Sequence, residues 1–102
     1  MKILITAATT ALAHKLKSKL NSPDVILGDY LELPAFMLEK QGMLQLPNPA
    51  ADSYTHLMLA LCLDNDIETV YLLNKAEADV LLLSEQLFKE YNISLVNGTI
   101  EI

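Results

Sequence analysis

The sequence predicts a doubly wound α/β domain, in which helices cover both faces of a mainly parallel sheet. Two observations predict it. A buried apolar run, a capped helical segment and a second buried run lie between Thr69 and Val96, and the same alternation occupies residues 2–28. Strand, helix and strand in so short a stretch form a β-α-β unit, which joins parallel strands by a right-handed crossover almost without exception.

The first unit begins with residues 2–6 (KILIT), a strand that is apolar on both faces, as in the middle of a parallel sheet. Thr9 or Thr10 can cap a helix that runs to about Leu20. A turn containing proline follows, and residues 24–28 (DVILG) form the second strand.

Prolines mark the middle of the chain. Pro34 suits the first turn of a short helix, and residues 43–46 form a brief edge strand. Pro49 starts a third long helix over residues 50–63, whose second half has no polar face. A helix that is apolar all round requires cover beyond the sheet itself. Its apolar residues are Leu57, Met58, Leu59, Ala60, Leu61, Cys62 and Leu63.

The last unit has a strand at residues 70–73 and a helix that Asn74 caps, with Glu77 three residues later completing a capping arrangement. This helix ends near Asn92, and residues 93–96 form the last strand. Its predicted buried stripe comprises Val80, Leu83, Leu87 and Tyr91.

These elements predict one three-layer α/β/α domain over residues 1–102, with a sheet of 4-5 strands in the order 3-2-1-4-5. This is a Rossmann-like arrangement, with its switch point between the first and fourth strands. In such sheets a ligand binds beyond the carboxyl ends of the strands at that point.

Composition excludes several classes of function. The net charge is −6, there is no arginine, and four of the seven lysines lie in residues 1–20, so nucleic-acid binding is not expected. The longest apolar run, residues 57–63, is too short to cross a membrane. The single cysteine, Cys62, fits a reducing compartment, and we expect a cytoplasmic protein. Residues 2–13 also resemble a short secretory signal, but three threonines interrupt it.

Candidate ligand-binding residues lie where the strands of the switch point end. They are Thr6, Ala7, Thr9, Thr10, Asp29 and Asn74. Threonine hydroxyls and free amides could hold a phosphate there, and an acid after the second strand is where dinucleotide binders hold a ribose. The alternative is that these side chains only cap helices and turns. We find no catalytic constellation and no metal-ligand spacing around His14 or His56, and we expect no cofactor.

Several stretches together carry a family resemblance. They are MKILITAATTALAHKLKSKL, VILGDY, QGMLQLPNP, LALCLDNDIETVYLLNKAEADVLLLSEQLFKEYNISLV and VNGTIEI. The chain resembles the amino-terminal pre-ATP-grasp domain of ATP-grasp ligases, in particular the carbamoyl-phosphate-synthase large-chain-like group. The first turn, TAATTALA, departs from the glycine-rich turn that is frequent in that family.

The resemblance implies a fold but transfers no catalytic residue, because the nucleotide and metals of such ligases are held mainly by the ATP-grasp domain that would follow Ile102. We therefore expect a free-standing, non-catalytic domain that acts through protein association. Its partner would be a second copy or a separate ATP-grasp chain. The alternatives are the amino-terminal piece of a split ligase and a small nucleotide- or phosphate-binding module. The candidate association surface comprises Leu57, Met58, Leu59, Leu61 and Cys62.

Overall fold

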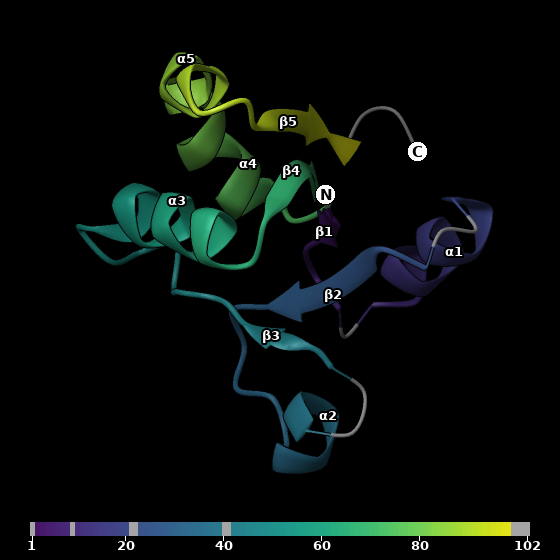
Figure 1. Cartoon of the computed structure of the whole chain (residues 1–102). Helices are drawn as coiled ribbons and strands as arrows, with labels where there is room; N and C mark the ends of the chain where they lie inside the picture. Colours follow the sequence, from purple (N-terminus) through teal and green to yellow (C-terminus); the bar gives the residue numbers. More distant parts are fainter. Residues whose placement is uncertain (1, 9, 21–22, 40–41, 99–102) are drawn as a thin grey trace.

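A five-stranded parallel sheet in the order β3-β2-β1-β4-β5 forms the middle of the molecule, which confirms the predicted fold class and strand order. The structure is a computed structural model and describes residues 2–8, 10–20, 23–39 and 42–98. The strands are β1 (Lys2–Ile5), β2 (Val25–Asp29), β3 (Leu44–Gln45), β4 (Ile67–Leu72) and β5 (Ser94–Asn97). β1 lies between β2 and β4, so the chain reverses its direction of winding at the β1/β4 pair (Figure 1).

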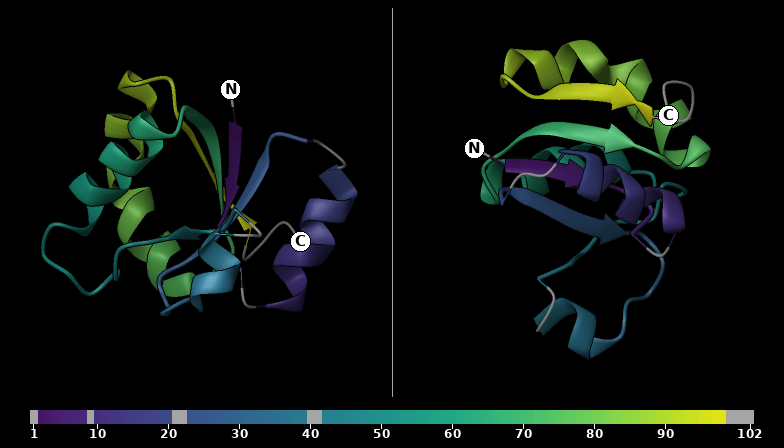
Figure 2. Two further views of the ribbon diagram at one scale, coloured as in Figure 1. Left: turned by 60° about the horizontal axis from the view of Figure 1, so that its bottom comes forward. Right: turned by 90° about the vertical axis from the view of Figure 1, so that its right-hand side faces the viewer.

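Helices lie on both sides of this sheet. They are α1 (Ala11–Leu20), α2 (Ala35–Glu39), α3 (Tyr54–Asp64), α4 (Lys75–Leu81) and α5 (Glu85–Glu90), with a 3₁₀ turn η1 (Leu82–Ser84) between the last two. α1 covers one face of the sheet, while α3, α4 and α5 cover the other (Figure 2, left). The short α2 lies beyond β3, at the edge of the sheet (Figure 1). Within the described residues, no helix has the length and apolar character that a bilayer span requires.

Each face of the sheet has its own apolar core. The larger core lies under α3, α4 and α5 and is built around Leu4, Tyr54, Met58, Cys62, Val70, Leu72, Leu81 and Phe88. The smaller core lies under α1 and is built around Ile5, Ala13, Leu16, Val25, Leu27, Leu33 and Met43. Neighbouring residues of β1, such as Leu4 and Ile5, point to opposite faces, as the period of a strand requires.

The start of the third long helix differs from the prediction. α3 begins at Tyr54, whereas Pro49 predicted a start near Ala50. Asn48 accepts a hydrogen bond from the Ala50 amide through its side chain, at 2.8 Å, and from the Ala51 amide through its carbonyl, at 2.9 Å. These bonds fold the segment after Pro49 into turns, which is the alternative that asparagine side chains offer to a helix.

The last helical segment also departs from the prediction. Instead of one helix up to Tyr91, the chain forms α4, the turn η1 and α5. Since a 3₁₀ turn is wound more tightly than an α-helix, η1 changes which side chains face the sheet. Leu83 is 88% exposed and Tyr91 49% exposed, so the predicted stripe is wrong at both positions, while Leu81 and Phe88 are fully buried.

Leu81, at the end of α4, and Leu83, within η1, test which side chains of this segment are buried. We expect Leu81→Ala to lower the free energy of unfolding by about 2–5 kcal/mol, because it leaves a cavity in the larger core. Leu83→Ala makes the same chemical change at an exposed position and should alter stability by less than about 0.5 kcal/mol. Urea denaturation measures both. Equal losses from the two variants would contradict the observed break.

Candidate functional site

Thr6 bridges β1 and β4 at the carboxyl edge of the sheet, where the predicted ligand crevice would open. Its amide and its Oγ1 both donate hydrogen bonds to the Tyr71 carbonyl, at 3.1 and 3.3 Å. Its Oγ1 in turn accepts a hydrogen bond from the Leu73 amide at 3.0 Å. Thr6 is fully buried. The hydroxyl that was predicted to face a ligand therefore closes the gap between the two strands.

The first turn of the chain is held by its own hydrogen bonds. The Ala8 amide donates to the Gly28 carbonyl, and the Thr10 amide donates to the Ala7 carbonyl, both at 3.0 Å. Thr10 Oγ1 also donates to the Ala7 carbonyl, at 2.7 Å, and accepts from the Ala13 amide at the start of α1. Ala7 has a φ of 55°, a left-handed conformation that costs a non-glycine residue free energy. Thr10 thus acts as a cap, while Thr9 lies outside the described residues.

Asp29 and Asn74, the other predicted ligand residues, also serve the fold. Asp29 is 2% exposed, and its Oδ1 accepts a hydrogen bond from the Leu31 amide at 3.0 Å, which shapes the turn after β2. Asn74 Oδ1 accepts from the amides of Ala76 and Glu77, at 2.9 and 3.4 Å, and so caps α4 as predicted. Binding of a phosphate by these residues stays a prediction.

A buried acid that the sequence pattern did not predict lies at this edge. Glu77 is fully buried, and neither of its carboxylate oxygens has a hydrogen-bond partner among the described residues. The Glu77 half of the predicted capping arrangement is therefore wrong. The Tyr54 hydroxyl at the start of α3 is buried and unpaired in the same way. A glutamate between Ala76 and Ala78, in a helix that must pack on a sheet, is the only signal in the sequence that could have indicated this burial.

Burial sets the protonation of this cluster. The pKa of Glu77 is raised from its ordinary 4.5 to about 7, chiefly by burial and also by the nearby Asp29, while the hydroxyls of Thr6 and Tyr54 oppose this rise. Neither hydroxyl approaches the carboxylate with full hydrogen-bond geometry. Burial and the nearby Glu77 raise the pKa of Tyr54 well above its usual range. Glu77 therefore exchanges its proton near neutral pH, although its carboxyl group is covered by protein.

The pKa of Glu77 predicts a pH-dependent stability. An acid whose pKa is higher in the folded than in the unfolded state stabilises the fold fully below the unfolded value and progressively less as the pH rises through the folded value. Relative to Glu77→Gln, the wild type should therefore lose about 3 kcal/mol of unfolding free energy between pH 4.5 and pH 7.5. Urea denaturation across this range measures the difference. The exposed Glu90→Gln is the control, and a pH-independent difference for Glu77→Gln would contradict the assignment.

Replacement of Thr6 tests the bridge between the strands. Thr6→Val keeps the shape but leaves the Leu73 amide without its side-chain acceptor, so the free energy of unfolding should fall by about 1–3 kcal/mol. Because the Thr6 hydroxyl lowers the pKa of Glu77, the variant should also raise that pKa, which a ¹³C NMR titration of the Glu77 carboxyl measures. Thr6→Ser retains the hydroxyl and should preserve the Glu77 pKa. Identical Glu77 pKa values for Thr6→Val and the wild type would contradict the influence of the Thr6 hydroxyl on this carboxyl group.

The predicted association surface on α3 needs a correction. Met58 and Cys62 are fully buried in the larger core, because with Tyr54 they form the stripe at four-residue spacing that faces the sheet. Burial raises the pKa of the Cys62 thiol to about 12, so this cysteine is an inert core residue. Leu59 and Leu61 are half-buried, whereas Leu57 is 47% and Leu63 49% exposed. The leucines that α3 leaves exposed are therefore Leu57 and Leu63, while Leu59 and Leu61 pack in part against the larger core.

Comparison with known proteins supports the fold of the chain alone. No protein-family model matches the chain, and no curated protein matches it. Among solved structures the chain is similar to an L-threonine dehydrogenase from Clostridium difficile, with a TM-score of 0.55 and 17% identity. The match covers 92% of this chain but 34% of the dehydrogenase. At this identity the similarity concerns the Rossmann-like arrangement. Within the described residues, no three histidine, cysteine or acidic side chains form a group that could hold a metal ion.

Proposed function

We propose that this chain is a non-catalytic, pre-ATP-grasp-like domain that acts through protein association, and that two copies pair through the outer face of α3. The observation that carries the proposal is the character of this helix. Two of its leucines, Leu57 and Leu63, leave about half of their surface in water, where an exposed helix of a stable monomer normally carries polar side chains. In a full ligase of the family that the chain resembles, part of this domain packs against a neighbouring domain.

The composition of α3 supports this proposal. From Tyr54 to Leu63 the helix carries no acidic residue and no lysine, and Asp64 is its first formal charge. Leu57 and Leu63 leave about half of their surface in water. Closed two-fold pairing is the commonest way for a single chain to cover such a surface, because the same patch then serves both copies. Each leucine that becomes buried contributes roughly 25 cal/mol for every Å² of apolar surface removed from water.

The hydrogen bonds at the carboxyl edge of the sheet favour a non-catalytic role. The side chains of Thr6, Thr10 and Asn74 are engaged in bridging two strands and in capping two helices. Glu77, the acid with a pKa near neutral, is fully covered by protein. A substrate would therefore have to displace bonds of the fold itself in order to reach these groups.

Two leucine substitutions test the proposed dimer. We expect Leu57→Glu to dissociate it, because the change places two charges per dimer in an apolar interface. Leu31→Glu is the matched control, since Leu31 is 50% exposed but belongs to the loop between β2 and α2 and not to α3. Sedimentation velocity at micromolar concentration measures the mass of the wild type and both variants, and circular dichroism checks that each variant is folded.

The wild type and the Leu31→Glu variant should sediment as dimers, and the Leu57→Glu variant as a monomer. A wild type that remains a monomer would contradict self-association. If that monomer bound a separately expressed ATP-grasp chain from the same genome, the split-ligase alternative would replace the proposed function.

A further inference from the structure

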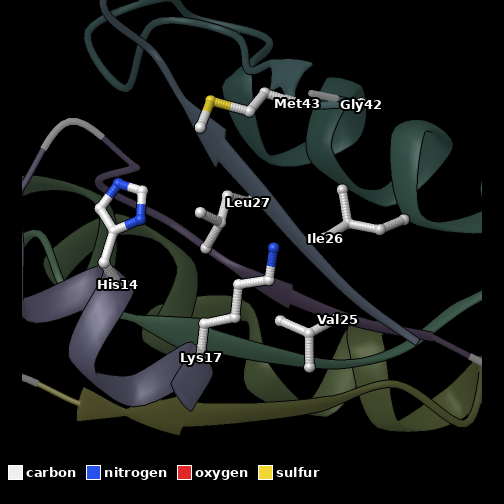
Figure 3. A pocket seen from close by; sticks show the side chains of 7 residues that line it. All are labelled: His14, Lys17, Val25, Ile26, Leu27, Gly42 and Met43. Atoms are coloured by element: carbon white, nitrogen blue, oxygen red, sulfur yellow. The ribbon is translucent and has the colours of Figure 1, made fainter. Parts of the chain in front are cut away.

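A hollow lies on the other face of the sheet, between α1, the strand β2 and the segment that leads into β3. Its volume is about 400 Å³, within the range of small-molecule sites. The residues that line it are His14, Lys17, Val25, Ile26, Leu27, Gly42 and Met43. His14 and Lys17 lie one turn apart on α1, on the side of the helix that faces β2 (Figure 3). The hollow therefore has two nitrogen-bearing side chains on one wall and apolar side chains opposite them.

The connection between β2 and β3 explains why this space is open. In a doubly wound sheet the helix of that connection normally covers the sheet beside the first helix. Here the connection forms only the five-residue α2, which lies beyond β3 at the edge of the sheet (Figure 1). At the rim, Gly42 has a φ of 66°, and no described atom lies within 4 Å of the position that a Cβ would take there. The face that a full helix would fill is left as a recess.

The charge around the recess favours an anion. No acidic side chain of the described residues lines it, although the whole chain has a net charge of −6. Residues 2–20 carry four lysines and no acid, so the surface around α1 is locally positive. Lys17 and His14 are both exposed, and among the described residues neither forms an ion pair. An anion that enters the recess would meet donors that the fold does not already use.

The apolar side chains opposite His14 and Lys17 indicate which kind of anion fits the recess. Val25, Leu27 and Met43 belong to the smaller core and expose less than a tenth of their surface, so they form a rigid apolar wall. An inorganic anion would make no contact that uses this apolar wall. A ligand that carries both a negative charge and a short hydrocarbon chain would contact the nitrogen-bearing side chains on one side and the apolar side chains on the other.

We propose that this recess is a binding site for a small organic anion, a carboxylate with a hydrocarbon chain. Its carboxylate pairs with Lys17 and accepts a hydrogen bond from His14, and its hydrocarbon chain packs against Val25, Leu27 and Met43. The site lies on the face of the sheet opposite α3, so it is independent of the proposed association surface (Figure 2, left).

Octanoate is the probe for this site. In a ¹H–¹⁵N NMR titration of the wild type, we expect saturable shifts in the amide signals of α1, β2 and the segment at Gly42 and Met43. Lys17→Gln should weaken binding about tenfold, since it removes a charge-assisted contact. Lys15→Gln makes the same change on α1 at an exposed lysine that does not line the recess, and it should bind octanoate as the wild type does.

Two further ligands test the charge contact and the hydrocarbon contact separately. Octanol has the hydrocarbon chain without the charge, and acetate has the charge with almost no chain, so both should bind far more weakly than octanoate. Absence of saturable binding to the wild type would overturn the proposal. Equal weakening by Lys17→Gln and Lys15→Gln, or equal affinity for octanol, would also overturn it. Sedimentation of the Lys17→Gln variant should match the wild type, so failure here is distinguishable from failure of the dimer.

Discussion

The side chain of Thr6 holds together the two strands at which the chain reverses its winding. β1 ends at Ile5, and the Thr6 amide donates a further backbone hydrogen bond to the Tyr71 carbonyl of β4. The Thr6 hydroxyl extends the pairing by bonding to the Tyr71 carbonyl and the Leu73 amide. In open α/β sheets this is the position at which the strands separate and a ligand enters. Here the separation is bridged, and the groups beneath it are sealed from water.

Glu77 is one of the groups buried at this edge. Its carboxyl group is fully covered by protein, so burial raises its pKa to about 7 and favours its neutral form. Tyr54 lies beside it from α3, and the two side chains connect α3 with α4 in the larger core. Tyr54 is also the first of three buried residues at four-residue spacing, followed by Met58 and Cys62. This anchoring fixes the rotation of α3 about its axis and turns Leu57 and Leu63 outward.

The sequence predicted the sheet well because each strand is a short apolar run between turn residues, and parallel order follows from the helices between the runs. It also predicted the caps at Thr10 and Asn74. Two features could not be read in this way. The run from Val80 to Leu83 is apolar at every position, so it carries no period that could reveal the break at η1. Glu77 stands where a capping pattern predicts an exposed acid, and only the packing of α4 on the sheet places it inside. A helix without a polar face does not show which side is buried, so the sequence includes Met58 and Cys62 among the candidates for association, although a lone cysteine in an apolar run also fits a buried core residue, which is where the structure places both.

The two faces of the sheet differ in a way that lets the two proposed sites coexist. α3 exposes Leu57 and Leu63 and carries no formal charge before Asp64, whereas α1 carries lysines and flanks a recess that no acid of the described residues lines. If two copies pair through α3, the sheet of each copy separates its α1 from the interface, and both recesses stay open to solvent. The short α2 leaves part of the sheet uncovered, and α3 leaves two leucines exposed on the opposite side. One leaves space for a small anion, and the other leaves a surface that a second copy can cover.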